Sequence, residues 1–260
     1  NLDVIKAAKE VLPRTPQIAI FDTAFHQSMP EEAFLYALPY SLYKKENIRR
    51  YGFHGTSHKY VNERAAKILK KKKLKTISVH LGNGSSITAC KNGESIDTSM
   101  GFTPLEGIPM GTRCGSIDPA ISFHLQKNLK MKANDVDTML NKESGLKGLS
   151  EISNDMREIY AAYKENDERA VRTIEHLCYQ AAKHIAGYSA ALKGFDTLVF
   201  TATMGEKAFY LRAKICEHLE HFGLQLDKKA NKNYKEGEEI ISTKESKITV
   251  LVIPTNEELQ

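Results

Sequence analysis

TISVHLGNG, residues 76–84, contains the pattern from which the fold class follows. Its first six residues are mostly apolar or β-branched, which predicts a buried strand, and Gly82-Asn83-Gly84 predicts a tight turn after it. Two further β segments are expected around 87–90 and 95–98, on either side of Asn92-Gly93, a dipeptide typical of two-residue hairpins. The stretch therefore predicts a buried strand that continues into an antiparallel hairpin.

Outside this block, strands alternate with helices along the chain. Buried strands are expected at Ile18–Phe21, Thr197–Phe200 and Ile248–Ile253. Four helices are expected: one capped by Thr56 or Ser57 and ending in Lys70–Lys73, one after the cap Asp118-Pro119, one over Glu168–Lys193 that stops at Gly194, and one over roughly Glu206–Phe222. Strands joined by helices, with a hairpin among them, predict an α/β domain with a mixed sheet flanked by helices.

The composition is that of an ordinary folded domain. The 260 residues are 41% hydrophobic and 27% charged, which excludes a disordered or collagen-like chain. A net charge of +5 gives weak support for a nucleic-acid partner, and we expect Lys70–Lys73 to be a solvated helix end instead of a binding patch. No apolar run is long enough to cross a membrane, and no leader is recognisable, so we expect no membrane association. Four cysteines lie far apart, as in a cytoplasmic protein with reduced thiols: Cys90, Cys114, Cys178 and Cys216.

Three segments carry residues suited to binding an anion. HLGNGSS (80–86) gathers backbone N–H groups and two hydroxyls at a strand end, as a phosphate cradle or as a plain β-turn. GFTPLEGIPMGTRCG (101–115) is a long glycine- and proline-rich loop in which Arg113 is free to meet a phosphate, the alternative being an ion pair with Asp118. RRYGFHGTSH (49–58) places His54 just before a helix, as an anion donor or as a core residue.

These segments and three others together resemble acetate kinase. The strings are FDTAFHQSMP (21–30), RRYGFHGTSHKYV (49–61), HLGNGSS (80–86), GFTPLEGIPMGTRCG (101–115), DMR (155–157) and PTNEEL (254–259). They occur in the family's order through nearly the whole chain, and the second and fourth are highly specific. The resemblance implies a ribonuclease H-like α/β fold of the actin, sugar kinase and heat-shock chaperone superfamily. It also implies reversible phosphoryl transfer between ATP and acetate, giving acetyl phosphate and ADP, with Mg²⁺ or Mn²⁺, in a homodimer.

The resemblance also implies roles for individual residues. Asp22 is expected to be the active-site carboxylate, and His54 and Arg113 to stabilise the transferring phosphoryl group. Glu257 is expected to help bind the metal. The positions expected to hold the nucleotide are His80, Leu81, Gly82, Asn83, Gly84, Asp155, Met156, Arg157, Thr203, Met204, Gly205, Glu206 and Lys207. Taken without the resemblance, Asp22 could equally be a cap, and DMR could be ordinary surface.

Two features depart from the family pattern. The chain begins at Asn1 and stops just after PTNEEL, so residues 1–22 are expected to be a remnant of the first domain and residues 23–260 the second domain. We expect a chain with these limits to be inactive or nearly so, because part of the cleft is missing. TATMGEK (201–207) replaces the family's Gly-Gly-Ile-Gly-Glu-Asn loop after the threonine, and a side chain at Thr203 is expected to hinder the nucleotide.

Three other functions stay open at this point. The nearest is a propionate or other short-chain acyl kinase, because the residues of the carboxylate pocket are not identified by the sequence. The altered TATMGEK loop makes pyrophosphate a conceivable phosphoryl donor. A non-catalytic relative that only binds is the third, although His54, Arg113 and Glu257 are all present.

Overall fold

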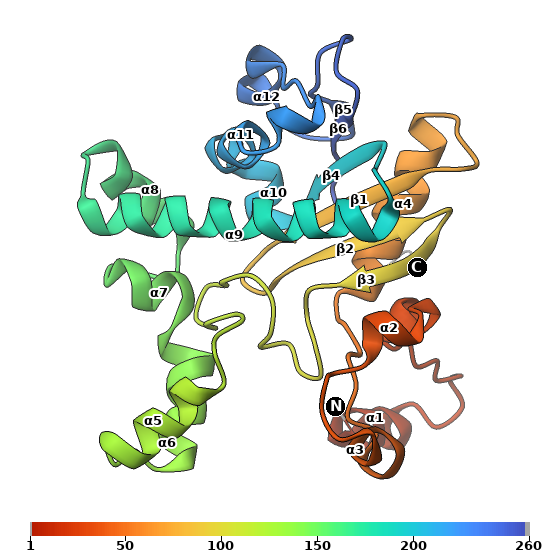
Figure 1. Ribbon diagram of the computed structural model, residues 1–260. Helices are drawn as coiled ribbons and strands as arrows, with labels where there is room; N and C mark the ends of the chain where they lie inside the picture. The colour runs from red at the N-terminus through yellow and green to blue at the C-terminus, as the bar shows by residue number, and fades with distance from the viewer. Residues whose placement is uncertain (1, 258–260) are drawn as a thin grey trace.

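The computed structural model describes residues 2–257 and contains one mixed sheet (Figure 1). Its strand order is β3-β2-β1-β4-β6-β5. β1 runs antiparallel to β2 and parallel to β4, and β4 runs parallel to β6. The strands are β1 Lys75–Leu81, β2 Ser85–Lys91, β3 Glu94–Thr98, β4 Thr197–Thr201, β5 Glu239–Ile240 and β6 Thr249–Val252. The predicted α/β class and mixed sheet are therefore confirmed.

Helices cover both faces of this sheet. α9 crosses the face formed by β1, β2 and β3, while α4 packs on the opposite face against β1 and β4 (Figure 1). The helices are α1 Leu2–Val11, α2 Glu31–Phe34, α3 Tyr40–Glu46, α4 Gly55–Ile68, α5 Ala120–Asn128, α6 Ala133–Thr138, α7 Gly145–Ser150, α8 Met156–Lys164, α9 Glu168–Leu192, α10 Ala202–Lys207, α11 Phe209–Glu217 and α12 Lys228–Asn233. No helix within residues 2–257 is long and apolar enough to cross a membrane.

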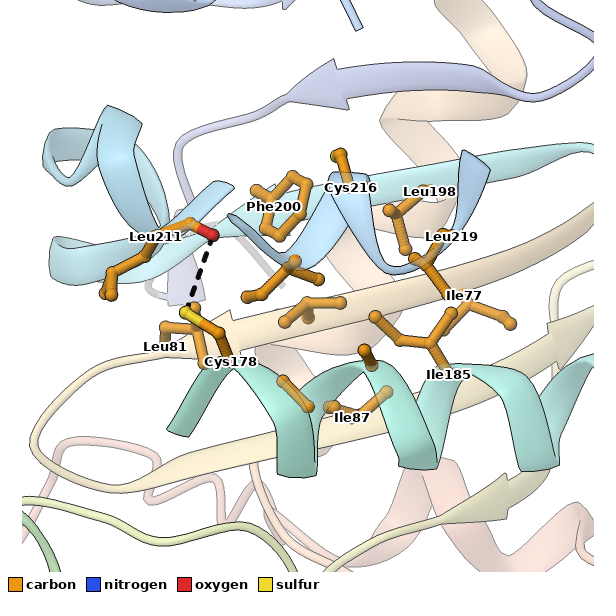
Figure 2. Packing of buried hydrophobic residues seen from close by; sticks show 14 of the residues in the cluster. Ile77, Leu81, Ile87, Cys178, Ile185, Leu198, Phe200, Leu211, Cys216 and Leu219 are labelled. Atoms are coloured by element: carbon orange, nitrogen blue, oxygen red, sulfur yellow. Dashed lines mark hydrogen bonds between the residues drawn. The ribbon is translucent and has the colours of Figure 1, made fainter. Parts of the chain in front are cut away.

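The two faces of β1 differ in polarity because its side chains alternate. Ile77, Val79 and Leu81 point into the main apolar core, where Ile185 of α9 also packs (Figure 2). Ser78 and His80 belong to the other face, where they meet polar side chains of α4. β1 is thus buried on both faces but apolar on only one of them. On the α4 face, Val199 of β4 and Leu251 of β6 form a second, smaller apolar cluster with Val61 and Ala65.

The predicted strand at Ile18–Phe21 is wrong. These residues have no regular secondary structure, and Ile18, Ile20 and Phe21 are 86%, 61% and 69% exposed. A strand forms only where a partner satisfies its backbone, and no strand of the described residues pairs with this segment. Its apolar run was therefore insufficient to predict its conformation. The other predicted strands are confirmed, and Asn92 and Gly93 both have positive φ, as a hairpin turn with a left-handed backbone requires.

The predicted caps are confirmed for two helices and wrong for a third. α9 ends as expected, with Lys193 and Gly194 in left-handed conformations, and Asp118 accepts a hydrogen bond from the N–H of Ala120 at the start of α5. Neither Thr56 nor Ser57 caps α4, because the helix already begins at Gly55, after His54. The hydroxyl of Thr56 reaches Asp22, and that of Ser57 bonds His80 instead.

The segment 200–222 also differs from its prediction. α10 begins directly after β4 without an intervening loop, four residues before the predicted helix start. The single helix expected over 206–222 is divided into α10, α11 and a short 3-10 turn, Glu220–Phe222. Ala208 separates α10 from α11 with φ −97° and ψ 75°, which no α-helix contains.

Candidate functional site

The candidate site lies where β1 and β4 end. The two strands are parallel neighbours, with His80 paired to Thr201, so the segments that follow them leave the sheet at the same edge. One is the turn 82–84, which leads into β2, and the other is α10. Carboxyl ends of parallel strands are the usual ligand-binding edge of an α/β sheet.

Asp22 is fixed at this edge by the start of α4. Its carboxylate accepts a 2.6 Å hydrogen bond from the backbone N–H of His54, and its carbonyl accepts one of 2.8 Å from Gly55. Gly55 is required here, because an added Cβ would lie 2.2 Å from that carbonyl oxygen. Asp22 thus accepts hydrogen bonds at the start of α4, as a cap does, and its carboxylate is half-buried. Its role as the active-site carboxylate stays a prediction.

Glu257 lies near Asp22. Burial raises the pKa of Glu257, and the Asp22 carboxylate raises it further by repulsion. Two neighbouring carboxylates are suited to Mg²⁺, which prefers oxygen ligands and commonly uses one or two carboxylates with water and phosphate. Within residues 2–257 there is no cluster of three His, Cys, Asp or Glu side chains that could hold a metal without other ligands. Glu258 and Leu259 of the PTNEEL string lie outside the described residues.

His54 and Arg113 meet at Gly84. A Cβ added to Gly84 would lie 3.2 Å from Nε2 of His54 and 3.3 Å from Nη1 of Arg113. Arg113 is half-buried and donates to the carbonyl of Pro104 at 3.3 Å, and it makes no ion pair with Asp118. Because glycine has no side chain at this point, an imidazole, a guanidinium and the backbone of the turn face one small space. Cationic and N–H donors converging in this way are suited to an anion.

The Arg113 loop is held by a group that the sequence did not single out. Arg50 donates to the carbonyls of Thr98, Ser99 and Met100 and forms a 2.7 Å ion pair with Glu106. Tyr36 also donates to Glu106, and burial together with this carboxylate raises the pKa of Tyr36 to about 12. Arg50 and Glu106 fall within the family strings and Tyr36 lies between two of them, but their pairing joins segments about 50 to 70 residues apart. Sequence spacing therefore gave no signal for it.

A cavity of about 740 Å³ opens beside the turn 82–84. Six of the predicted nucleotide positions in 155–157 and 203–207 line it, together with Gly82, Asn83 and three aromatic side chains. The six predicted positions are Asp155, Met156, Arg157, Thr203, Met204 and Lys207, and the three aromatic residues are Tyr160, Phe209 and Tyr210. Tyr160 and Tyr210 stack with their centroids 3.6 Å apart. The side chain of Thr203 is exposed at this cavity and does not close it.

Other predicted positions lie outside the cavity lining. The side chain of Leu81 is fully buried in the apolar core, so only its backbone could contribute to a ligand site. His80 is 7% exposed, stacks on His54 with centroids 4.1 Å apart, and bonds the hydroxyl of Ser57. Gly205 is buried under β1, and burial raises the pKa of the half-buried Glu206. These four residues shape the edge of the site instead of lining the cavity.

The histidines at this edge are neutral. Burial lowers the pKa of His54, and the nearby Arg113 lowers it further, although Asp22 opposes the shift. Burial also lowers the pKa of His80 to about 3 and that of His26 to about 4. At neutral pH each ring therefore carries one proton and can donate through one nitrogen only.

Comparisons with known proteins agree with this architecture, an α/β domain with a cavity beside the ends of two parallel strands. The model of the acetokinase family matches residues 1–260. The acetate kinase of Pseudothermotoga lettingae is 52% identical over 261 residues, which cover 100% of this chain and 64% of that protein. The chain belongs to the acetokinase family.

Solved structures extend the likeness to the backbone. The crystal structure of Porphyromonas gingivalis acetate kinase superposes with a TM-score of 0.95 at 44% identity, covering 99% of this chain and 65% of that one. A propionate kinase from Francisella tularensis gives the same TM-score at 46% identity, covering 99% of this chain and 66% of that one. The chain thus spans about 65% of the length of these relatives.

Proposed function

We propose that the full-length protein is an acetate kinase, which transfers a phosphoryl group reversibly between ATP and acetate. The observation that carries the proposal is the convergence of His54 and Arg113 on Gly84, beside a cavity large enough for a nucleoside. The membership of the family and the 52% identity to an acetate kinase support the same activity.

The geometry suits a loose phosphoryl-transfer transition state. Charge spreads over the equatorial oxygens of the transferring group, so fixed cations and N–H donors lower the barrier most. Arg113 supplies the cation and His54 a neutral N–H donor. Acetate is already an anionic nucleophile at neutral pH and needs no general base, so Asp22 positions groups and removes no proton. The backbone of the turn 82–84 is expected to hold ATP phosphates.

Asp22 and Glu257 would hold Mg²⁺ or Mn²⁺, directly or through water. When bound, the metal would neutralise charge on the phosphates of the nucleotide. The pKa of Glu257 is raised first by desolvation and then by the Asp22 carboxylate, which fits a divalent cation bound beside these two groups.

The cavity is proposed as the adenosine site. Asp155 caps α8 and pairs with Arg157, which fixes the wall that carries Met156. Thr203, Met204 and Lys207 form the opposite wall on α10. Gly205, Glu206, His80 and Leu81 stay predictions of nucleotide contact, made through the backbone or through neighbouring residues.

The remaining features of the proposal concern the whole protein. We propose that it works as a homodimer, with no nucleic acid or membrane as partner. We also propose that it is cytoplasmic, because its four cysteines are unpaired. Residues 1–22 are proposed to belong to a first domain and residues 23–260 to a second one. Alone, the 260-residue chain is expected to show little or no turnover.

The experiment is an acyl phosphate assay of the full-length protein with Mg²⁺, in which the acid and the phosphoryl donor are varied separately. Turnover with acetate and ATP is expected. A higher kcat/KM with propionate would replace acetate by its homologue, and the difference is limited to about 10- to 200-fold for one methylene. No acyl phosphate with any acid and donor would contradict the proposal and favour a protein that only binds.

Pyrophosphate is the second donor to be tested, because Thr203 and Lys207 stand at the cavity where the family has glycine and asparagine. The double variant Thr203→Gly with Met204→Ile is expected to lower the KM for ATP and leave the KM for acetate unchanged. An unchanged KM for ATP would show that this loop does not limit nucleotide binding.

A further inference from the structure

Four buried polar residues connect α4 and the sheet to the ring of His54. Asn62, Ser78, His58 and Ser86 are each no more than 5% exposed. We call these four residues the polar chain. The amide of Asn62 lies 3.2 Å from the Ser78 hydroxyl, which lies 2.8 Å from Nδ1 of His58. Nε2 of His58 lies 2.7 Å from the Ser86 hydroxyl, which lies 2.8 Å from Nδ1 of His54.

The direction of this chain is set at Asn62. Its Nδ2 lies 2.8 Å from the carbonyl oxygen of His58, so this atom must be the amide nitrogen and a donor. It therefore donates to Ser78 as well. Among the described residues, the buried hydroxyl of Ser78 then has one acceptor for its own proton, Nδ1 of His58.

Each later step follows from the one before. Because Nδ1 of the neutral His58 ring accepts, its proton is on Nε2, which donates to Ser86. Ser86 then has its hydroxyl proton left for Nδ1 of His54. His54 must carry its own proton on Nε2, the atom that faces Gly84. Reversing the chain would leave the buried Ser78 hydroxyl without an acceptor, which costs about 1–3 kcal/mol.

We propose that the polar chain fixes the tautomer of His54, holding the ring neutral with its Nε2–H directed at the transferring phosphoryl group. The inference rests on the proposed function for the identity of that group. It makes Ser86 a positioning residue, since Ser86 acts on the reaction only through His54. A protonated His54 would need an acceptor at Nδ1, whereas Ser86 presents a donor there.

The tautomer of His80 is set in the same way, by a separate hydrogen bond from a buried serine. The fully buried hydroxyl of Ser57 lies 2.8 Å from Nδ1 of His80, its one acceptor among the described residues. The proton of His80 is therefore on Nε2, which lies 3.5 Å from a Cβ placed on Gly82. The two stacked rings thus direct N–H donors at the same turn.

The test measures the tautomer directly. The full-length protein is labelled with ¹⁵N-histidine, and two-bond ¹H–¹⁵N correlations distinguish Nε2–H, Nδ1–H and doubly protonated rings. The His54 signals are assigned by their loss in His54→Gln. At pH 7.5 we expect His54 and His58 as single Nε2–H tautomers. A proton on Nδ1 of either ring, or two protons on His54, would overturn the proposal.

Two serine variants separate positioning from packing. Ser86→Ala removes the donor to His54, and we expect kcat to fall about tenfold or more while the KM for ATP stays within about twofold. Ser95→Ala is the matched control, because Ser95 is equally buried and bonds a histidine, His26, that is not part of the chain. It should lower the melting temperature as much as Ser86→Ala does, without changing the His54 signals. A wild-type kcat in Ser86→Ala would also overturn the proposal.

The two proposals fail in different ways. If the full-length protein made no acyl phosphate but His54 showed a single Nε2–H tautomer, the proposed function would fail and the tautomer assignment would stand. If acetate kinase activity were present and His54 carried its proton on Nδ1, only the inference about the polar chain would fail.

Discussion

The ends of β1 and β4 lie side by side and are built in opposite ways. Beyond β1, the chain makes a tight turn at 82–84, and hydroxyls and imidazoles from three elements surround it. Beyond β4, the chain enters α10 directly, and one buried guanidinium holds the far end of that helix. Side chains at the ligand edge fix the first end. Arg212 fixes the second end by binding the carbonyls at the C-terminal end of α10.

The difference separates two tasks. The β1 end presents donors whose position and protonation decide how an anion is bound. The β4 end only supplies a wall for the cavity, so its surface residues, such as Thr203, are free to vary while the helix stays in place. Substitutions at the first end should therefore change turnover, and those at the second should change stability or nucleotide affinity.

The largest effect is expected from Arg113→Ala. It removes the cation that faces Gly84, and kcat should fall about 10²- to 10³-fold, as for loss of a transition-state donor in other enzymes. Steady-state kinetics of the full-length protein measure this. His54→Ala removes a neutral donor and should cost less. A loss under about tenfold in Arg113→Ala would show that the β1 end does not carry the chemistry.

The corresponding substitution at the β4 end is Arg212→Met. Arg212 is 1% exposed and donates to the carbonyls of Gly205 and Glu206 and to Asn231. Burial lowers its pKa to about 10. Removing these donors leaves buried carbonyls unpaired, and we expect a loss of about 3 kcal/mol in the free energy of unfolding.

Urea denaturation measures this loss, and Arg169→Met is the control. Arg169 pairs with Asp167 at an exposed helix start, so its removal should change stability little. Equal effects of the two variants would show that Arg212 does not hold α10. A fall in kcat for Arg212→Met far beyond the change in KM for ATP would contradict the division between the two ends.

Acid should affect stability through the buried histidines and through Glu206 in opposite directions. The folded protein keeps His26 and His80 neutral down to about pH 4 and pH 3, whereas the unfolded chain protonates them near pH 6.5. Stability should therefore fall by about 1.4 kcal/mol per pH unit for each of these histidines as the pH drops below 6.5. Glu206 acts the other way, because burial raises its pKa and the folded state gains protons first.

Urea denaturation at several pH values between 7.5 and 5 measures how the free energy of unfolding changes with pH. His26→Gln removes one group whose protonation is linked to unfolding. It should therefore reduce the slope of the free energy of unfolding against pH by about 1.4 kcal/mol per pH unit, whatever it does to absolute stability. Hydrogen exchange should locate the acid-induced opening at 78–86 before 201–207. A slope that does not change in His26→Gln would show that His26 is not held neutral in the folded protein.

The sequence predicted the hairpin at 76–98 well because its signals are local, namely β-branched residues, a glycine turn and Asn92-Gly93. It failed at Ile18–Phe21, since an apolar run does not tell whether a partner strand exists. Family strings led to His54 and Arg113, and the structure brings both to Gly84.

The polar chain could not be predicted from spacing. Its members come from α4, β1 and β2, and only the packing of α4 on the sheet brings His58 between Ser78 and Ser86. One signal was nevertheless present. Ser78 and His80 alternate with apolar residues along β1, which indicates a strand with one polar face even though the strand is buried.

The smallest effect concerns the backbone at the start of α10. Ala202 is 7% exposed and has φ 64°, a left-handed conformation that costs an alanine about 1 kcal/mol and a glycine almost nothing. Ala202→Gly loses a buried methyl group but relieves this strain, so we expect a net gain of about 0.5 kcal/mol in stability. Ala208 at the other end of α10 is equally buried and has φ −97°, so Ala208→Gly should lose about 1 kcal/mol in stability.

Urea denaturation of the two variants tests this contrast. Stability changes of opposite sign would show that the β4 end carries backbone strain, in contrast to the side-chain network at the β1 end. A loss of stability in both variants would mean that Ala202 is held by packing, as any buried alanine is, and that its left-handed backbone costs nothing measurable.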